Sequence, residues 1–240
     1  MNILICDSYG HLSEKAAEMI ARQVNTKPDC VLGLATGSTP IGTYAALTKL
    51  YEAGKVDFSR VTSYNLDEYY PMSPENPQSY RYFMEEQLFR HINIRPEATH
   101  VPDGATDNPA ATCADYDRQI EAAGGIDLQL LGIGQNGHIG FNEPDATLYA
   151  STHLTPLTED TIAANARFFS SPEEVPTHAI SMGMGSILRA RSILLLISGK
   201  NKHAALSQLL SDKVDPLCPA TFLKLHPCVT VLCDREAYDG

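Results

Sequence analysis

Six short apolar runs spread along the chain constrain its fold more than any other feature of the sequence. They are residues 2–6, 30–34, 61–65, 126–133, 192–198 and 228–233. Segments with the periodicity of amphipathic helices lie between several of them, for example at residues 12–24, 43–51 and 202–210. Strands that alternate with helices pack as a parallel sheet, because each crossover returns the chain to the same end of the sheet. The sequence therefore predicts an α/β fold with a single doubly wound, mostly parallel sheet and helices on both faces.

No internal repeat, low-complexity tract or charged block divides the chain, so we expect one Rossmann-like domain over residues 1–240. Two segments depart from the regular alternation. Residues 71–79 contain three prolines, which predict a rigid turn and a wall near a site. Residues 144–178 are rich in Thr, Ala and Pro with weak periodicity. A long segment of this kind after a glycine-rich loop is typical of a lid, so we expect a lid within about 144–178.

Charge and cysteine content narrow the class of protein. A net charge of −11 with scattered Lys and Arg disfavours nucleic acid and anionic membranes as partners. The six cysteines form no CxxC pair, which is typical of a reducing compartment. Neither a signal-peptide pattern nor an apolar run of membrane-spanning length occurs. We therefore expect a cytoplasmic protein that binds a small molecule, and the sequence leaves its oligomeric state open.

The fourth apolar run ends in a glycine-rich segment, residues 131–144, that carries His138 and Glu143. In α/β enzymes the active site lies at the carboxyl ends of such strands. The glycines allow a sharp turn and a close approach to a ligand, while a histidine five residues before a glutamate offers a proton carrier and an orienting partner. The alternative is an ordinary tight turn in which His138 caps a backbone group.

A second loop combines hydroxyls with a glycine before a predicted helix. Hydroxyls and free backbone N–H groups at a helix N-terminus bind anions, and Pro40 suits the first helical turn. The spacing and ending of a nucleotide-binding P-loop are missing, so a monophosphate on a small molecule is the better ligand. An ordinary capped helix start is the alternative. The loop residues are Thr36, Gly37, Ser38 and Thr39.

Two adjacent acids, Asp67 and Glu68, follow the third strand. Adjacent residues of an extended chain point to opposite sides, so only one of them faces the crevice, and the pattern does not choose between them. A carboxylate in a desolvated crevice can act as base for a carbon-bound proton. The alternative is a solvated acid at a strand end.

Two cations lie where loops meet the expected crevice. Arg167 belongs to the lid segment, and Lys202 follows the strand at 192–198. An acidic protein that binds an anion needs a local positive field, which these side chains can supply. The alternative for each is a solvated surface charge.

With residues 36–40, 64–69, 132–144 and 164–169 occurring in this order, the chain resembles the glucosamine-6-phosphate deaminases over about residues 1–235. The resemblance implies a deaminating hydrolase of amino sugar catabolism. Such an enzyme converts glucosamine 6-phosphate and water to fructose 6-phosphate and ammonia by an aldose–ketose isomerisation coupled to loss of the amine. It implies neither a metal nor an organic cofactor.

The resemblance also implies roles for individual residues. Asp67 is similar to the base that moves a proton from C2 to C1 of the open-chain sugar. His138 is similar to the group that opens the sugar ring, oriented by Glu143 and Asn136. The residues similar to the phosphate site are Thr36, Gly37, Ser38, Thr39, Arg167 and Lys202.

One residue and one segment distinguish this chain from some members of the family it resembles. Some carry Asp where this chain has Asn136; an aspartate would favour the imidazolium form of His138, whereas an amide only hydrogen-bonds. Some bind N-acetylglucosamine 6-phosphate at an allosteric site built from basic residues soon after the motif 141–144. Residues 145–155 contain no Arg or Lys, so we expect no allosteric activation.

Two other functions remain open from the sequence. The family of 6-phosphogluconolactonases resembles this chain in fold and phosphate site, but a lactone hydrolase does not need Asp67 together with His138 and Glu143. A non-catalytic sugar-phosphate sensor is the second alternative, and it has no use for an intact set of these three side chains.

Overall fold

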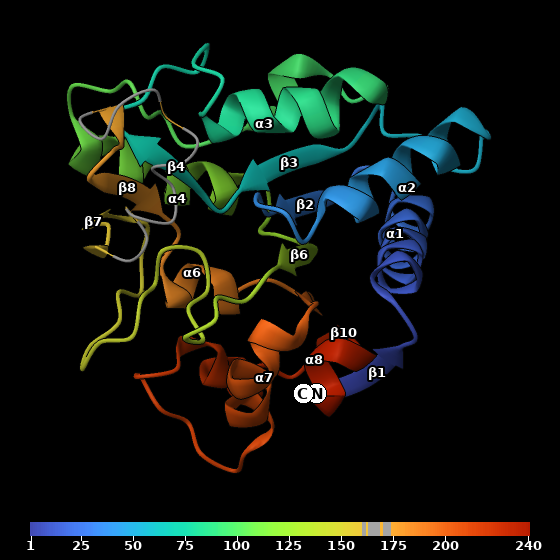
Figure 1. The fold of residues 1–240 in the computed structure, drawn as a ribbon. Helices are drawn as coiled ribbons and strands as arrows, with labels where there is room; N and C mark the ends of the chain where they lie inside the picture. The colour runs from blue at the N-terminus through green and yellow to red at the C-terminus, as the bar shows by residue number, and fades with distance from the viewer. Residues whose placement is uncertain (160–161, 163–168, 170–173) are drawn as a thin grey trace.

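The computed structural model describes residues 1–159, 162, 169 and 174–240. Within these ranges, seven parallel strands form a central sheet in the order β1-β10-β9-β6-β2-β3-β5 (Figure 1). The strands are β1 (Asn2–Cys6), β2 (Val31–Leu34), β3 (Thr62–Asn65), β5 (Thr99–His100), β6 (Leu128–Leu131), β9 (Ile193–Ile197) and β10 (Val229–Asp234). The predicted doubly wound α/β sheet is confirmed, and each of the six apolar runs is one of its strands.

The direction in which strands are added to the sheet reverses between β2 and β6. From β2 the chain proceeds through β3 to β5 at one edge, whereas from β6 it proceeds through β9 to β10 on the other side. The loops that follow β2 and β6 therefore turn away from each other, which opens a crevice at the carboxyl ends of these neighbouring strands.

Alternating side chains of the strands build an apolar core on each side of the sheet. On β9, Leu194 and Leu196 join the core beneath α1 (Tyr9–Thr26), α2 (Ile41–Glu52) and α3 (Tyr80–Gln87). Ile193, Leu195 and Ile197 join the opposite core. That side is covered by α4 (Pro109–Ala122), α6 (Met184–Leu188), α7 (His203–Leu210) and α8 (Arg235–Asp239). Helices thus cover both faces, as predicted (Figure 1).

Short 3-10 helices connect several of these elements. They are η1 (Phe89–His91), η2 (Pro96–Ala98), η4 (Lys200–Lys202) and η5 (Pro219–Leu225). Among the described helices, none has the length and apolar character needed to cross a membrane. All six cysteines are free thiols.

A second, antiparallel sheet of three strands was not expected from the sequence. It pairs β4 (Asp67–Tyr70) with β8 (His178–Ser181), and β8 with β7 (His153–Pro156). Leu66 marks the junction, because its N–H bonds to Leu34 of the central sheet while its carbonyl accepts the N–H of Met182. Only Leu66 separates β3 from β4, so no turn signal in the sequence marks the passage from one sheet to the other. Two of the three strands thus begin within residues 144–178, where a lid was expected.

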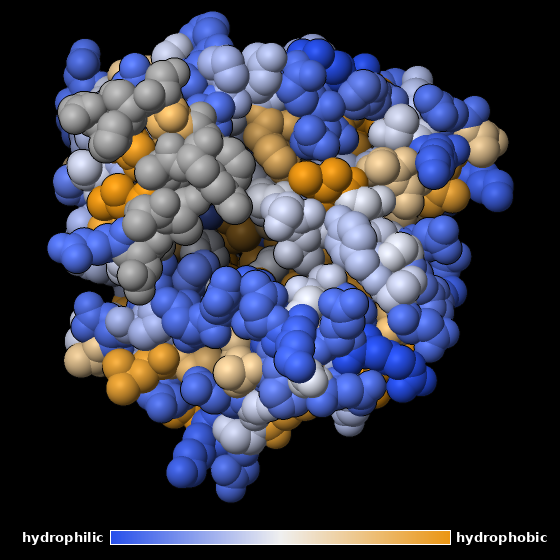
Figure 2. All heavy atoms as spheres, viewed as in Figure 1, coloured by the Kyte–Doolittle hydropathy of each residue, from blue (hydrophilic) through white to orange (hydrophobic). Residues whose placement is uncertain are grey.

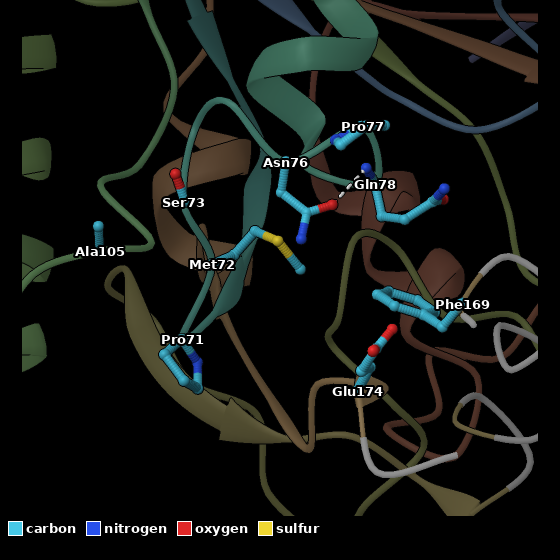
Figure 3. Close-up of a pocket in the computed structure, with 9 residues that line it drawn as sticks. All are labelled: Pro71, Met72, Ser73, Asn76, Pro77, Gln78, Ala105, Phe169 and Glu174. Atoms are coloured by element: carbon cyan, nitrogen blue, oxygen red, sulfur yellow. Dashed lines mark hydrogen bonds between the residues drawn. The ribbon is translucent and has the colours of Figure 1, made fainter. Parts of the chain in front are cut away.

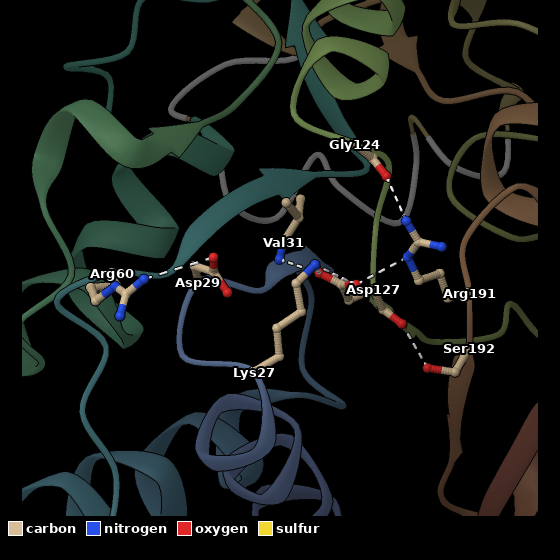
Figure 4. A network of polar contacts seen from close by, with 8 residues as sticks. All are labelled: Lys27, Asp29, Val31, Arg60, Gly124, Asp127, Arg191 and Ser192. Atoms are coloured by element: carbon tan, nitrogen blue, oxygen red, sulfur yellow. Dashed lines mark hydrogen bonds and ion pairs between the residues drawn. The ribbon is translucent and has the colours of Figure 1, made fainter.

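A polar cluster lies at the amino edge of the central sheet, that is, at the amino ends of its strands. The crevice lies at the opposite, carboxyl ends. Asp127, directly before β6, is 4% exposed. Its carboxylate accepts hydrogen bonds from Lys27 Nζ at 2.8 Å, Val31 N at 2.8 Å and Arg191 Nε at 3.1 Å (Figure 4). It therefore ties the end of α1, the start of β2 and the turn before β9 to one point.

Candidate active site

The loops at the carboxyl ends of β2, β3 and β6 enclose a cavity of about 560 Å³. Residues from widely separated parts of the sequence line it, as the switch in strand order requires. The face of the molecule in Figure 2 is largely hydrophilic, with a hollow near its middle. The predicted site residues that line the cavity are Thr36, Gly37, Ser38, Thr39, Asp67, Asn136, His138 and Lys202. Glu143 does not line the cavity but contacts His138, and Arg167 lies outside the described residues.

The two adjacent acids have different surroundings. Glu68 accepts the backbone N–H groups of Tyr69 at 2.9 Å, Tyr80 at 2.8 Å and Arg81 at 2.9 Å, and so caps the start of α3. Asp67 lines the cavity, and its carboxylate accepts no hydrogen bond from the described residues. Of the pair, only Asp67 lines the cavity, and its carboxylate is free of backbone donors from the described part of the chain.

Burial dominates the acid–base properties of Asp67. Its side chain lies beneath the loop at Gly140, and loss of hydration, followed by the charge of Glu68, raises its pKa to about 8. Burial also raises the pKa of Glu68, to about 7, although its three backbone donors act in the opposite direction. A carboxyl with a pKa near neutrality can both accept and return a proton.

A tight turn after β6 places His138 at the cavity. The Gly134 N–H donates to the His138 carbonyl at 2.9 Å, and Gly137 closes the turn with φ +86°. A Cβ at Gly137 would lie 2.3 Å from Cys218 Sγ, so only glycine fits there. Two contacts of 3.2 Å join His138 Nδ1 to the Glu143 carboxylate. With Nδ1 held in this way, Nε2 is the nitrogen that has no partner among the described side chains.

Asn136 reaches the imidazole only indirectly. Its Nδ2 donates to Glu143 Oε2 at 2.8 Å, and its Oδ1 accepts the backbone N–H of His138 at 3.2 Å. The side chain of Glu143 is 14% exposed, so these bonds fix a largely buried carboxylate. The expected interaction of residue 136 with His138 is therefore made through Glu143 and the backbone.

The hydroxyl-rich loop connects β2 to α2. Gly37 has φ +90°, a conformation that glycine adopts without strain, and α2 begins at Ile41 with Pro40 at its N-cap. Lys202, at the end of η4, lines the same cavity, and burial lowers the pKa of its ammonium. No carboxylate of the described ranges lies within ion-pair distance of it. A loop of this kind beside an unpaired cation suits an anion such as a phosphate.

Several residues that line the cavity were not predicted. Tyr80, Phe141 and Thr158 contribute to its walls. The rings of Tyr80 and Phe141 are stacked with centroids 6.2 Å apart, and Tyr69 packs against both. Their apolar surfaces help to exclude water from Asp67. Single aromatic residues in a helix or loop carry no periodic signal, so the sequence could not assign them to the site.

The proline-rich turn at 71–79 lies beside a different cavity, of about 670 Å³ (Figure 3). Pro71, Met72, Ser73 and Asn76 line it together with Phe169 and Glu174. Phe169 in turn touches Tyr69, with ring centroids 6.3 Å apart. The turn is thus close to the candidate site but is separated from it by the aromatic side chains.

Comparisons with known proteins agree on one family. The sequence model of "Glucosamine-6-phosphate isomerases/6-phosphogluconolactonase" matches residues 7–231. A glucosamine-6-phosphate deaminase of Halothermothrix orenii is 56% identical over 99% of this chain and 98% of its own length. The enzyme of the same name from Thermoanaerobacter pseudethanolicus is 52% identical over 99% of this chain and 94% of its own length.

Solved structures show the same relationship. A monomeric glucosamine-6-phosphate deaminase superposes with a TM-score of 0.96 at 45% identity, covering 100% of this chain and 99% of its own. The 6-phosphogluconolactonase from Leishmania guyanensis superposes with a TM-score of 0.74 at 21% identity, covering 100% of this chain and 98% of its own. The second similarity shows the fold alone.

Proposed function

The chain belongs to the family of glucosamine-6-phosphate isomerases and 6-phosphogluconolactonases, and we propose that it is a glucosamine-6-phosphate deaminase. It converts glucosamine 6-phosphate and water to fructose 6-phosphate and ammonia. One observation carries the proposal: a buried carboxylate, Asp67, shares a cavity with an anion-binding loop and a histidine–glutamate pair. An isomerase that moves a proton between carbons needs such a base, whereas hydrolysis of a lactone does not.

The phosphate of the substrate binds to the loop Thr36–Thr39 and to Lys202. The hydroxyls and backbone of the loop support this assignment, because they line the cavity directly before α2, where the positive end of the helix dipole favours an anion. Arg167, outside the described residues, is proposed as a further phosphate ligand from its sequence motif alone. Two cations and a helix start would give the dianion a local positive field in a protein with a net charge of −11.

His138 opens the sugar ring by moving a proton between the C1 hydroxyl and the ring oxygen. The 3.2 Å contacts of Nδ1 with Glu143 support this role, since they hold the ring with Nε2 available for the substrate. Asn136 then serves as a positioning residue, because its amide donates to the same carboxylate at 2.8 Å.

Asp67 removes the proton from C2 of the open-chain aldehyde and returns it to C1. Loss of the C2 proton to Asp67 gives an enol, whose oxygen on C1 takes a proton from the neighbouring ammonium group and so leaves a neutral amine on C2. Return of the proton from Asp67 to C1, with the nitrogen lone pair forming the C2=N bond, gives a protonated imine. Water hydrolyses the imine to the ketone and releases ammonia. One carboxylate can serve neighbouring carbons on the same face of the substrate, and a pKa of about 8 suits both removal and return of the proton.

We also propose that the protein works in the cytoplasm as one domain over residues 1–240, with no cofactor, and that a lid lies within residues 144–178. Six free thiols support a reducing compartment. Thr158, from this segment, lines the cavity, which supports a covering role for its neighbours.

Ammonia release from glucosamine 6-phosphate tests the function directly, with the wild type compared with Asp67→Asn. We expect turnover by the wild type and a loss of at least about 10³-fold in kcat for the variant, because removal of a general base costs about that factor. Binding of the substrate should be retained, since Asp67 is not part of the phosphate site. Acid release from 6-phosphogluconolactone without ammonia from the amino sugar would favour the lactonase. Binding without either reaction would favour a sensor.

A further inference from the structure

The side chain of Tyr9 connects the first helix to the loop that follows β2. Ser8 caps α1, with its Oγ accepting the N–H of His11 at 3.2 Å, so Tyr9 lies in the first turn. The Tyr9 hydroxyl lies 3.0 Å from the carbonyl oxygen of Thr39 and 3.2 Å from that of Ser38. It also accepts the N–H of Gly42 at 2.8 Å. One hydroxyl therefore contacts two carbonyls of the loop and one N–H at the start of α2.

These contacts fix the direction of peptide groups in the loop. An anion is bound by inward N–H groups, and a carbonyl oxygen turned toward it would repel it. Ser38 and Thr39 line the catalytic cavity and also a neighbouring cavity of about 380 Å³, which contains Tyr9. Tyr9 does not line the catalytic cavity, so the two carbonyls that share its single hydroxyl proton turn toward Tyr9 and away from the place where the anion binds.

The same hydroxyl also joins α1 to α2. The Gly42 N–H belongs to the first turn of α2, where backbone donors have no partner within the helix, and Tyr9 supplies the acceptor. A Cβ at Gly42 would lie 3.0 Å from the Tyr9 oxygen and 2.4 Å from Ser13 Oγ. Glycine at this position allows the close approach that the hydrogen bond requires.

We propose that Tyr9 is a positioning residue for phosphate binding, which acts through the loop Thr36–Thr39 without touching the substrate. The inference rests on the proposed function, in which this loop holds the phosphate of glucosamine 6-phosphate. The expected signature of such a role is a change in phosphate affinity at constant turnover, because Asp67 and His138 have no contact with Tyr9.

Tyr9→Phe removes the hydroxyl and keeps the ring. We expect the KM for glucosamine 6-phosphate to rise about fivefold, as expected from loss of about one net hydrogen bond. The Kd of inorganic phosphate, measured by calorimetry, should rise by a similar factor, while kcat and the pH profile of kcat/KM stay within twofold. Tyr238→Phe is the matched control. Tyr238 is 40% exposed, against 38% for Tyr9, and makes no hydrogen bond to a described residue.

The outcomes separate the two proposals. A wild type that binds phosphate but releases no ammonia contradicts the deaminase assignment, and the phosphate Kd of Tyr9→Phe still tests the positioning role. Unchanged KM and Kd in an active Tyr9→Phe variant overturn the inference alone. A fall in kcat together with a lower Tm overturns it as well, because it indicates a general structural defect. Wild-type protein that binds no phosphate contradicts both proposals.

Discussion

At the scale of single residues, the environment of Asp67 predicts how activity depends on pH. Burial, followed by the charge of Glu68, raises the pKa of this carboxyl to about 8. A base acts only when ionised, so the protonated form that dominates below this pKa is inactive. We therefore expect kcat/KM to rise about tenfold per pH unit up to about pH 8 and then to level off. A profile that is flat between pH 6 and 8 would contradict the proposed surroundings of Asp67.

The residue at position 136 offers a second test. Asn136→Asp replaces a donor to Glu143 with a second carboxylate at the same place, where Nδ2 now lies 2.8 Å from Oε2. Negative charge added beside the His138–Glu143 pair favours the imidazolium form. Protonated His138 then adds to the loss of activity that protonated Asp67 causes, so we expect the acid limb of the kcat/KM profile to steepen and move to higher pH. Asn136→Ala, which removes the donor without adding charge, is the control; equal pH profiles in the two variants would refute this reading.

Single residues also show which contacts could be predicted from the sequence and which could not. The spacing of His138 and Glu143 predicted a contact, which the structure contains. The choice between Asp67 and Glu68 needed the structure, because strand alternation allows either to face the crevice. It depends on α3, whose first N–H groups are bonded to Glu68. Nothing in the sequence around Glu68 indicates that the start of α3 lies beside its side chain.

At the scale of elements, Asp127 predicts a stability effect that is separate from catalysis. The carboxylate is 4% exposed and joins three elements through Lys27, Val31 and Arg191. Asp127→Ala leaves the Val31 N–H and two cations without this partner, and we expect the free energy of unfolding to fall by about 2 kcal/mol. Urea denaturation measures the loss, and KM and kcat should be unchanged because the cluster lies at the amino edge of the sheet.

A matched control lies nearby in the same network of charges (Figure 4). Asp29 pairs with Arg60 at 3.8 Å, and both side chains are exposed. Asp29→Ala should cost less than about 0.5 kcal/mol, since surface ion pairs are weak in water. Equal losses for Asp127→Ala and Asp29→Ala would show that burial does not strengthen the Asp127 contacts.

Strands with an apolar run of at least five residues were predictable from the sequence, and the other strands were not. All six runs are strands of the central sheet, and the inner ones are buried on both faces, whereas the edge strand β1 keeps an apolar run although most of it is exposed. β5 has only two residues, too few for a periodic signal. β7 has intermediate or exposed residues along its length and ends in a proline, so it resembles a loop in sequence. Strands of the second sheet depend on partners that are distant along the chain.

At the scale of the whole molecule, the fold separates function from stability. The candidate site occupies the carboxyl edge of the central sheet, and the Asp127 cluster closes its amino edge. Loops at the first edge carry the proposed ligand-binding side chains, whereas the contacts at the second edge join elements without lining the candidate site. This division explains why the motifs that identify the site are short and lie at strand ends. The fold, in contrast, could be predicted from the apolar runs.

Residues 145–155, which follow the glycine-rich loop at 131–144, determine whether an anionic effector could bind near this loop. Residues 145–155 contain no Arg or Lys. The segment is held by its backbone, since the Tyr149 and Ala150 carbonyls accept the N–H groups of Met184 and Ser186. Asp117 accepts the N–H and hydroxyl of Thr152, at 2.9 and 2.7 Å, so the nearest charge bonded to the segment is negative. An anionic effector would be repelled there.

We therefore expect N-acetylglucosamine 6-phosphate to leave the enzyme unactivated. The rate should depend hyperbolically on glucosamine 6-phosphate. Adding the N-acetylated sugar phosphate should leave the half-saturation point unchanged within about twofold. An effector that does not bind one conformational state more tightly than the other cannot shift the equilibrium between them. Initial rates across substrate concentrations, with and without the effector, measure this. Inorganic phosphate at the same concentration is the control for competition at the catalytic site. A sigmoidal curve that becomes hyperbolic only with the N-acetylated compound would show that cations from elsewhere in the chain complete an effector site.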